Sequence, residues 1–154
     1  MPKPPQVVPT TLADYLDAMS RAVFSAGMNW KVIDAKWDGT REAFDGFDPI
    51  AVAGYTPDDV ERLMADTRIV RNRKKIEAII ANAGELIVAD RDFGGIDKYL
   101  ASFADNDDLV KDLHKRFAFL GDSVAHFFLF GVGANPAAQE KWAHDHFGDG
   151  HHRR

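Results

Sequence analysis

The chain of 154 residues contains no cysteine, which excludes disulfides and thiolate metal sites. It also lacks a long apolar run. The first ten residues, MPKPPQVVPT, carry prolines where a signal peptide would need an apolar segment, and no later stretch is long enough to cross a bilayer. We therefore expect a soluble, cytoplasmic protein that makes no membrane contact.

Positive charge is also scarce. Nineteen Lys and Arg against 24 Asp and Glu give a formal net charge of −5, which argues against strong, indiscriminate binding to nucleic acid. Any contact with DNA must therefore be local. The cations concentrate in one run without acidic residues, which we call the basic cluster: Arg68, Arg71, Arg73, Lys74 and Lys75. A weaker group comprises Lys111, Lys115 and Arg116.

Strand-like alternation is absent, whereas apolar residues recur with helical spacing along most of the chain. Helix starts are predicted at Thr11 with Asp14, at Asp48 before Pro49, and at Thr56 with Asp59, because these side chains can accept hydrogen bonds from unpaired N–H groups. The length fits one domain. We predict an all-α, single-domain protein with a flexible leader at 1–10, a folded body at 11–147 and a flexible tail at 148–154.

A helix-hairpin-helix is predicted between residues 113 and 123, where a helix end, a short apolar turn and a new helix start follow one another. Gly121 would let the backbone approach DNA closely, and the N–H groups that follow could point at a phosphate. The residues expected to contact the DNA backbone here are Phe119, Leu120, Gly121, Asp122 and Ser123.

Three motifs resemble the bacterial DNA-3-methyladenine glycosylase I family. They are residues 44–83, AFDGFDPIAVAGYTPDDVERLMADTRIVRNRKKIEAIIANA, the segment AGMNW at 26–30, and the F-x-F-x-G turn of the hairpin. The resemblance runs from about Ala18 to about Gly133. It implies a helix-hairpin-helix DNA glycosylase-like helical bundle. The implied activity is hydrolysis of the N-glycosidic bond of an alkylated, 3-methyladenine-like purine after the base is flipped out of the duplex.

The resemblance also implies a base pocket around Trp30, since the family's tryptophan at this place stacks on the extruded base. Phe24 and Asn29 are expected to line the pocket as well. The alternative is that Trp30 is a core residue of a helical domain. The family's glutamate that recognises the methylated adenine corresponds to Ala22, so the recognition carboxylate is missing here.

The family's zinc site cannot form from Cys-His-His-Cys ligands, because this chain has no cysteine and a proline-rich leader replaces the family's N-terminal segment. Four C-terminal histidines could hold a metal or could belong to a solvated tail: His144, His146, His151 and His152. We predict no structural zinc and no cofactor. Beyond the hairpin, in residues 135–145, Glu140 and Asp145 are the only carboxylates, and neither lies in a recognisable catalytic motif, so the catalytic residue stays unassigned.

Two hypotheses remain. The chain is either a glycosylase that acts on damaged double-stranded DNA as a monomer, or a catalytically silent relative that binds damaged or bent duplex. In both, four cations of the basic cluster are expected to contact DNA phosphates, the alternative being a solvated helix face: Arg71, Arg73, Lys74 and Lys75.

Overall fold

The computed structural model describes residues 6–147, without the side chains of residues 146 and 147, and all regular structure in that range is helical. The predicted all-α class is therefore confirmed. None of the described helices is both long and apolar enough to span a membrane. In chain order the elements are α1 Leu12–Ser25, α2 Trp30–Ala43, the 3-10 turn η1 Asp45–Phe47, α3 Pro49–Ala53, α4 Pro57–Met64, α5 Arg73–Phe93, α6 Ile96–Ala101, α7 Asn106–Arg116, α8 Asp122–Gly131 and α9 Pro136–Phe147.

The predicted helix starts are confirmed at their side chains. Thr11 and Asp14 form a capping box at α1, in which Thr11 Oγ1 accepts from the N–H of Asp14 at 3.2 Å. Asp48 caps α3 by accepting from the N–H of Ile50 at 3.1 Å. At α4, Asp59 reaches back to accept from the N–H of Thr56 at 2.9 Å. These caps satisfy donors that the helices leave unpaired.

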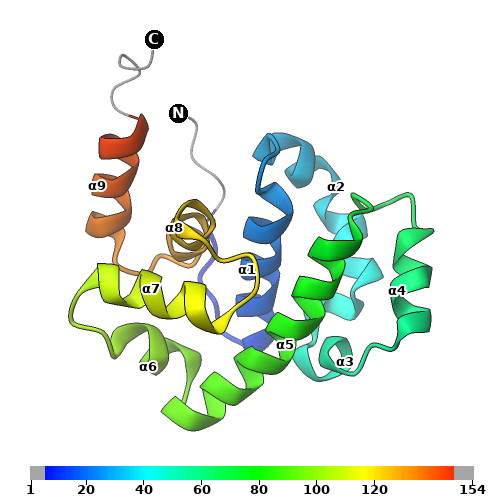
Figure 1. The fold of residues 1–154 in the computed structure, drawn as a ribbon, viewed down its shortest axis with the longest axis horizontal. Helices are drawn as coiled ribbons and strands as arrows, with labels where there is room; N and C mark the ends of the chain where they lie inside the picture. Colours follow the sequence, from blue (N-terminus) through cyan, green and yellow to red (C-terminus); the bar gives the residue numbers. More distant parts are fainter. Residues whose placement is uncertain (1–5, 148–154) are drawn as a thin grey trace.

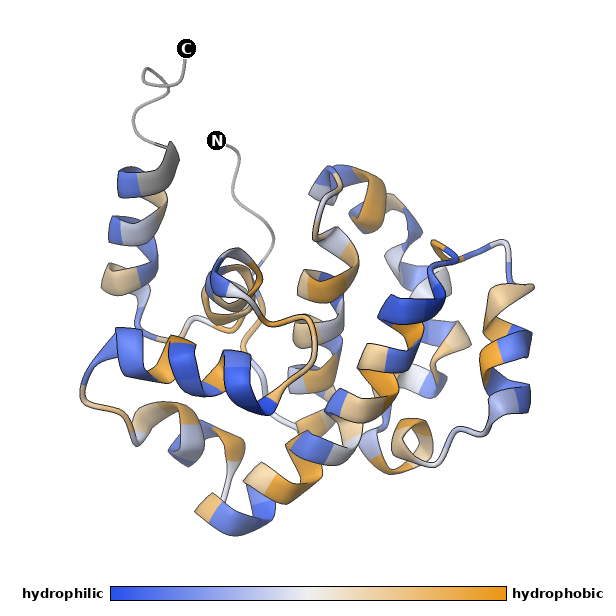
Figure 2. Ribbon diagram, in the orientation of Figure 1, coloured by the Kyte–Doolittle hydropathy of each residue, from blue (hydrophilic) through white to orange (hydrophobic). Residues whose placement is uncertain are grey.

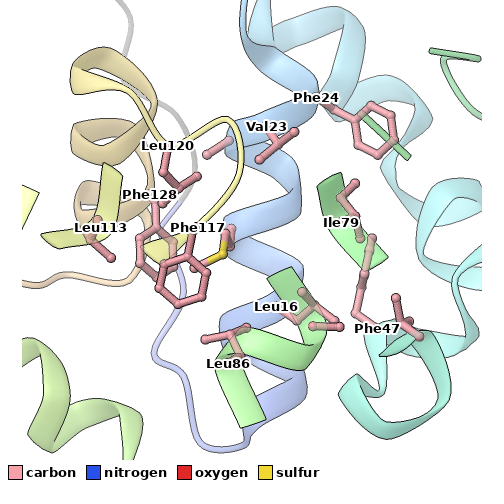
Figure 3. Packing of buried hydrophobic residues seen from close by; sticks show 14 of the residues in the cluster. Leu16, Val23, Phe24, Phe47, Ile79, Leu86, Leu113, Phe117, Leu120 and Phe128 are labelled. Carbon is pink, nitrogen blue, oxygen red and sulfur yellow. The ribbon is translucent and has the colours of Figure 1, made fainter. Parts of the chain in front are cut away.

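Helix α1 lies at the centre of the fold and packs against both α5 and α8, while α3 packs on α5 (Figure 1). Apolar residues, orange in Figure 2, recur along these helices, and many of them are buried in one core. Figure 3 shows buried side chains of α1, α5 and the α7–α8 region meeting in this core, among them Leu16, Val23, Ile79, Leu86, Phe117, Leu120 and Phe128. The two predicted site regions, α1–α2 and the hairpin, are therefore parts of one core.

An aromatic cluster supports the other side of α1. Phe24 packs edge-on against Trp37, with ring centroids 6.1 Å apart, and Trp37 stacks on Phe47 at 5.4 Å. The turn that brings Phe47 inward has three consecutive residues with positive φ, of which Asp45 and Phe47 are unfavourable and Gly46 is not. Burial of aromatic surface offsets this backbone cost.

Residues 6–10 of the expected leader are described, and they are attached to the body. The N–H of Val7 donates to the carbonyl of Gly131 at 2.8 Å, and Gln6 Nε2 donates to the carbonyl of Phe130 at 2.9 Å. This part of the leader therefore bonds to carbonyls at the C-terminal end of α8. Residues 1–5 and the expected tail at 148–154 lie outside the described residues.

Candidate nucleic-acid interface

The predicted hairpin is formed by α7, a short loop at residues 117–121, and α8. Phe117 and Leu120 are buried and anchor the loop in the core. Phe119 between them is 43% exposed and has φ of 63°, a conformation that side chains rarely adopt. The loop is therefore held at both ends while its middle residue faces solvent.

The start of α8 leaves backbone donors unpaired. Within residues 6–147, the N–H groups of Gly121, Asp122 and Ser123 donate no hydrogen bond, and Ser123 is exposed. Such a helix start can accept an anion. The Asp122 side chain, however, carries the same charge as a phosphate, and it accepts a hydrogen bond from the indole N–H of Trp142 in α9 at 2.7 Å. Only the backbone of Asp122 can bind phosphate.

The basic cluster divides into free and paired cations. Arg71 and Lys74 are exposed and make no hydrogen bond or ion pair with another described residue. Arg73 forms an ion pair with Glu61 at 2.7 Å. Arg68 pairs with Asp66 at 2.7 Å, and its guanidinium holds the pKa of that carboxyl at about 2. The free positive charge is therefore concentrated on Arg71 and Lys74.

Lys75 does not lie on the surface with the other cations of the basic cluster, which argues against the predicted contact with DNA. Its side chain is only 6% exposed, because Nζ points into the protein and donates to the carbonyls of Ala26 at 2.7 Å and Phe24 at 3.1 Å. Burial lowers the pKa of the Lys75 ammonium. A group already bonded to two internal carbonyls cannot reach a phosphate.

The predicted pocket residues lie at the end of α1 and the start of α2. Trp30 is the first residue of α2 and is half-buried, and Asn29 caps this helix by accepting from the N–H of Lys31 at 2.9 Å. Ala22 is buried within α1. Phe24 lies inside the aromatic cluster, so its ring supports this end of α1 from within and is not an exposed pocket wall.

One helix brings the predicted segments together. At the start of α5, Lys75 reaches the loop that leads to Trp30, and two turns later Asn82 reaches the hairpin. Asn82 Nδ2 donates to the carbonyl of Ala118 at 3.0 Å, and Oδ1 accepts from the N–H of Ala118 at 2.7 Å. Asn82 is not among the residues predicted from the sequence. Its signal was a polar residue on the apolar stripe formed by Ile79 and Leu86.

No metal centre accompanies this interface in the described part of the chain. Among the residues described there is no group of three His, Cys, Asp or Glu side chains suited to a metal. The side chains of His146, His151 and His152 lie outside that range, so the prediction of no zinc stays a prediction. A cleft of about 220 Å³ near the start of α1 is lined by Tyr15, Asp97, Leu100, Ala101, Val132, Ala134 and Asn135, none of them a predicted site residue.

Known proteins resemble this chain in both sequence and fold. Residues 13–119 match the family model described as methyladenine glycosylase. The chain is 31% identical to DNA-3-methyladenine glycosylase 1 of Escherichia coli, with 70% of this chain and 69% of the relative covered, and 27% identical to the Haemophilus influenzae DNA-3-methyladenine glycosylase, with 70% of each covered. A crystal structure of 3-methyladenine DNA glycosylase I superposes with a TM-score of 0.73 at 28% identity, covering 83% of this chain and 82% of the other. A single-substitution variant of such an enzyme in complex with 3-methyladenine gives 0.74, also at 28% identity, covering 85% and 80%.

Proposed function

Because the chain belongs to the methyladenine glycosylase family, we propose that it is a base excision repair N-glycosylase that flips an alkylated purine out of DNA and hydrolyses its glycosidic bond. The expected substrate is an alkylated purine that resembles 3-methyladenine, the base bound in the related complex.

The observation that carries the proposal is the convergence of three surfaces along α5. Lys74 lies on this helix and Arg71 lies two residues before it begins. The loop that leads to Trp30 and the hairpin are both hydrogen-bonded to this helix. A flipped base needs an aromatic surface close to groups that hold the flanking phosphates. Trp30 and Asn29 are the residues we assign to the base, and the start of α8 is assigned to the phosphates.

The chemistry requires no dedicated nucleophile. A cationic methylated purine is a good leaving group, so the protein's task is to bind, orient and stabilise the charged transition state. Stacking on Trp30 and phosphate contacts at the α8 start serve the first two needs. Without a carboxylate at Ala22, discrimination among bases is expected to suffer more than hydrolysis.

Ala22 also supports the second candidate, a silent relative that binds damaged or bent duplex. Its methyl group is buried in α1 and offers no acceptor to a purine. Such a protein would keep the hairpin and the cations while losing base release.

We further propose that the partner is double-stranded DNA and that the protein acts as a monomer in the cytoplasm. The hairpin and the cations form a single, local interface, which suffices for one chain to engage one lesion.

Base release from a panel of lesion-bearing duplexes tests the proposal, with Trp30→Ala as the matched inactive variant. We expect release of at least one alkylated purine, and loss of that release in Trp30→Ala without loss of duplex binding. Duplex binding without release of any base would favour the silent relative. Absence of both binding and release would contradict both candidates.

A further inference from the structure

Two polar side chains of α5 are buried on the same face, and both bond to backbone outside their own helix. Lys75 and Asn82 are seven positions apart, which is two helical turns and about 10 Å along the axis. Neighbouring positions on this face, including Ile79 and Leu86, are apolar and belong to the core. The two polar groups therefore interrupt an otherwise apolar stripe.

Lys75 completes the C-terminal end of α1. There the carbonyl of Val23 accepts from the N–H of Ala26 and the carbonyl of Ser25 accepts from the N–H of Met28. The carbonyls of Phe24 and Ala26 are taken by Lys75 Nζ. A cation at this end is also favoured by the helix dipole. The loop from Ala26 to Asn29, which leads directly to Trp30, is thereby fixed at its first residue.

Asn82 acts in the same way on the hairpin. Its amide bonds both the N–H and the carbonyl of Ala118, as a neighbouring strand would, and the side chain is 1% exposed. Ala118 immediately precedes Phe119 with its positive φ. The side chains of Phe117 and Leu120 are apolar, and the N–H of Phe117 donates to the carbonyl of Leu113 within the end of α7. Asn82 therefore supplies the directional side-chain bonds that hold the loop backbone at Ala118.

We propose that Lys75 and Asn82 are positioning residues that hold the base-binding loop and the DNA-binding hairpin at a fixed separation along α5. The inference rests on the proposed function and assigns a separate role to each of the two residues. Lys75 sets the placement of Trp30 and thus base release, whereas Asn82 sets the placement of the α8 start and thus affinity for DNA. A residue that serves folding alone would affect both properties together.

Asn82→Asp tests the hairpin part, because the variant keeps the acceptor for the Ala118 N–H and replaces the donor by a carboxylate that faces the Ala118 carbonyl. At pH 8 we expect affinity for a duplex with a tetrahydrofuran abasic analogue to fall at least tenfold. At pH 5 the difference in duplex affinity between Asn82→Asp and the unmodified protein should become smaller, since the protonated carboxyl can again donate to the Ala118 carbonyl. The ion pair of Arg116 with Glu85, three positions beyond Asn82 in α5, is present in both proteins.

Lys75→Met tests the loop part, because it keeps the length of the side chain and removes both hydrogen bonds. We expect release of purines from a dimethyl sulfate-treated duplex to fall at least tenfold, with affinity for the abasic duplex within threefold of the unmodified protein. Glu77→Gln, on the exposed face of α5, is the control for a change in this helix and should alter neither quantity.

Thermal unfolding of each variant, and amide hydrogen exchange at Ala118, separate positioning from loss of fold. Unchanged DNA affinity in Asn82→Asp despite faster exchange at Ala118 would overturn the inference. So would a parallel loss of affinity and base release in both variants that follows the loss of stability. If the unmodified protein binds duplex but releases no base, the proposed activity fails and the Lys75 part with it, while Asn82→Asp still decides the hairpin part. If it binds no duplex, both proposals fail.

Discussion

Ala22 is a position at which we expect this chain to depart from the family it belongs to. The resemblance assigns a recognition glutamate to this position, whereas the structure has a buried methyl group. Losing one hydrogen bond to a charged group costs about 1.5–3 kcal/mol. That corresponds to roughly tenfold to a hundredfold in discrimination, at about 1.4 kcal/mol per decade.

We therefore predict weak or undetectable 3-methyladenine excision by the unmodified protein, and stronger excision by Ala22→Glu. Single-turnover release of 3-methyladenine from alkylated duplex is the measurement. Ala22→Gln is the matched control, because it has the same length without the charge. Equal gains in both variants would show that shape rather than charge is missing. Robust release by the unmodified chain, unaffected by Ala22→Glu, would show that another residue recognises the base.

A second prediction for a single side chain concerns Asp66. Its carboxylate bonds the N–H and the guanidinium of Arg68, which lowers its pKa from 3.8 to about 2. A carboxyl whose pKa is lower in the folded state stabilises the fold above its unfolded pKa and loses this effect as the pH falls toward the folded value. Asp66→Asn should therefore lower the free energy of unfolding by about 1 kcal/mol at pH 6. The difference between the two proteins in urea unfolding should shrink between about pH 4 and pH 2. A constant difference over that range would contradict the assigned pKa.

Among the elements, α8 of the hairpin begins with a carboxylate, that of Asp122, at a helix start that can bind an anion. Asp122 stabilises α8 through the helix dipole but repels a phosphate bound to the same N–H groups. Two like charges about 6 Å apart repel by about 0.7 kcal/mol in water. Asp122→Asn keeps an acceptor for Trp142 and removes the charge, so we predict about threefold tighter binding to duplex at low salt. Titrations with Asp122→Glu provide the charged control, and equal affinity of all three proteins would refute the effect.

The helices and the hairpin could be predicted from the sequence because their signals are local. Thr11, Asp48 and Asp59 act within a few residues of their partners, and the glycine at the end of the turn marks the hairpin directly. The partners of the charged and polar groups could not be predicted, since they depend on distant segments. Trp142 reaches Asp122 from another helix.

The burial of Lys75 was not predicted for a reason specific to helices. A run of cations was interpreted as one surface, although successive residues of a helix point in different directions. Lys75, Ile79, Asn82 and Leu86 follow one another at intervals of four, three and four residues, which is the spacing of a single face. Helical periodicity would have separated Lys75 from Lys74. It could not have named the carbonyls that Lys75 bonds.

The molecule as a whole carries a net charge of −5, so its affinity for DNA must depend on where its few free cations lie. Arg71 and Lys74 are exposed and unpaired among the described residues, whereas Arg73 is bound to Glu61. We predict that Arg71→Ala with Lys74→Ala weakens binding to all duplexes alike, damaged or not, because phosphate contacts do not distinguish bases. Each lost phosphate contact lowers the slope of log affinity against log salt by about 0.9, so the double variant should lose about 1.8.

The matched control is Arg91→Ala with Lys98→Ala, which produces the same net charge. Arg91 lies near the C-terminal end of α5, about 25 Å along the axis from Lys74, and Lys98 lies in α6, the helix that follows. At physiological ionic strength the screening length is about 8 Å, so these distant charges should change the salt slope little. Fluorescence anisotropy of a labelled duplex across a salt series measures both variants. If the control variant reduced the slope of log affinity against log salt as much as Arg71→Ala with Lys74→Ala does, binding would depend on overall charge. Arg71 and Lys74 would then be solvated surface residues. A slope reduced only by the changes at Arg71 and Lys74 would mean that an acidic protein approaches DNA through one face, with the loop of Trp30 beside the cations that make the contact.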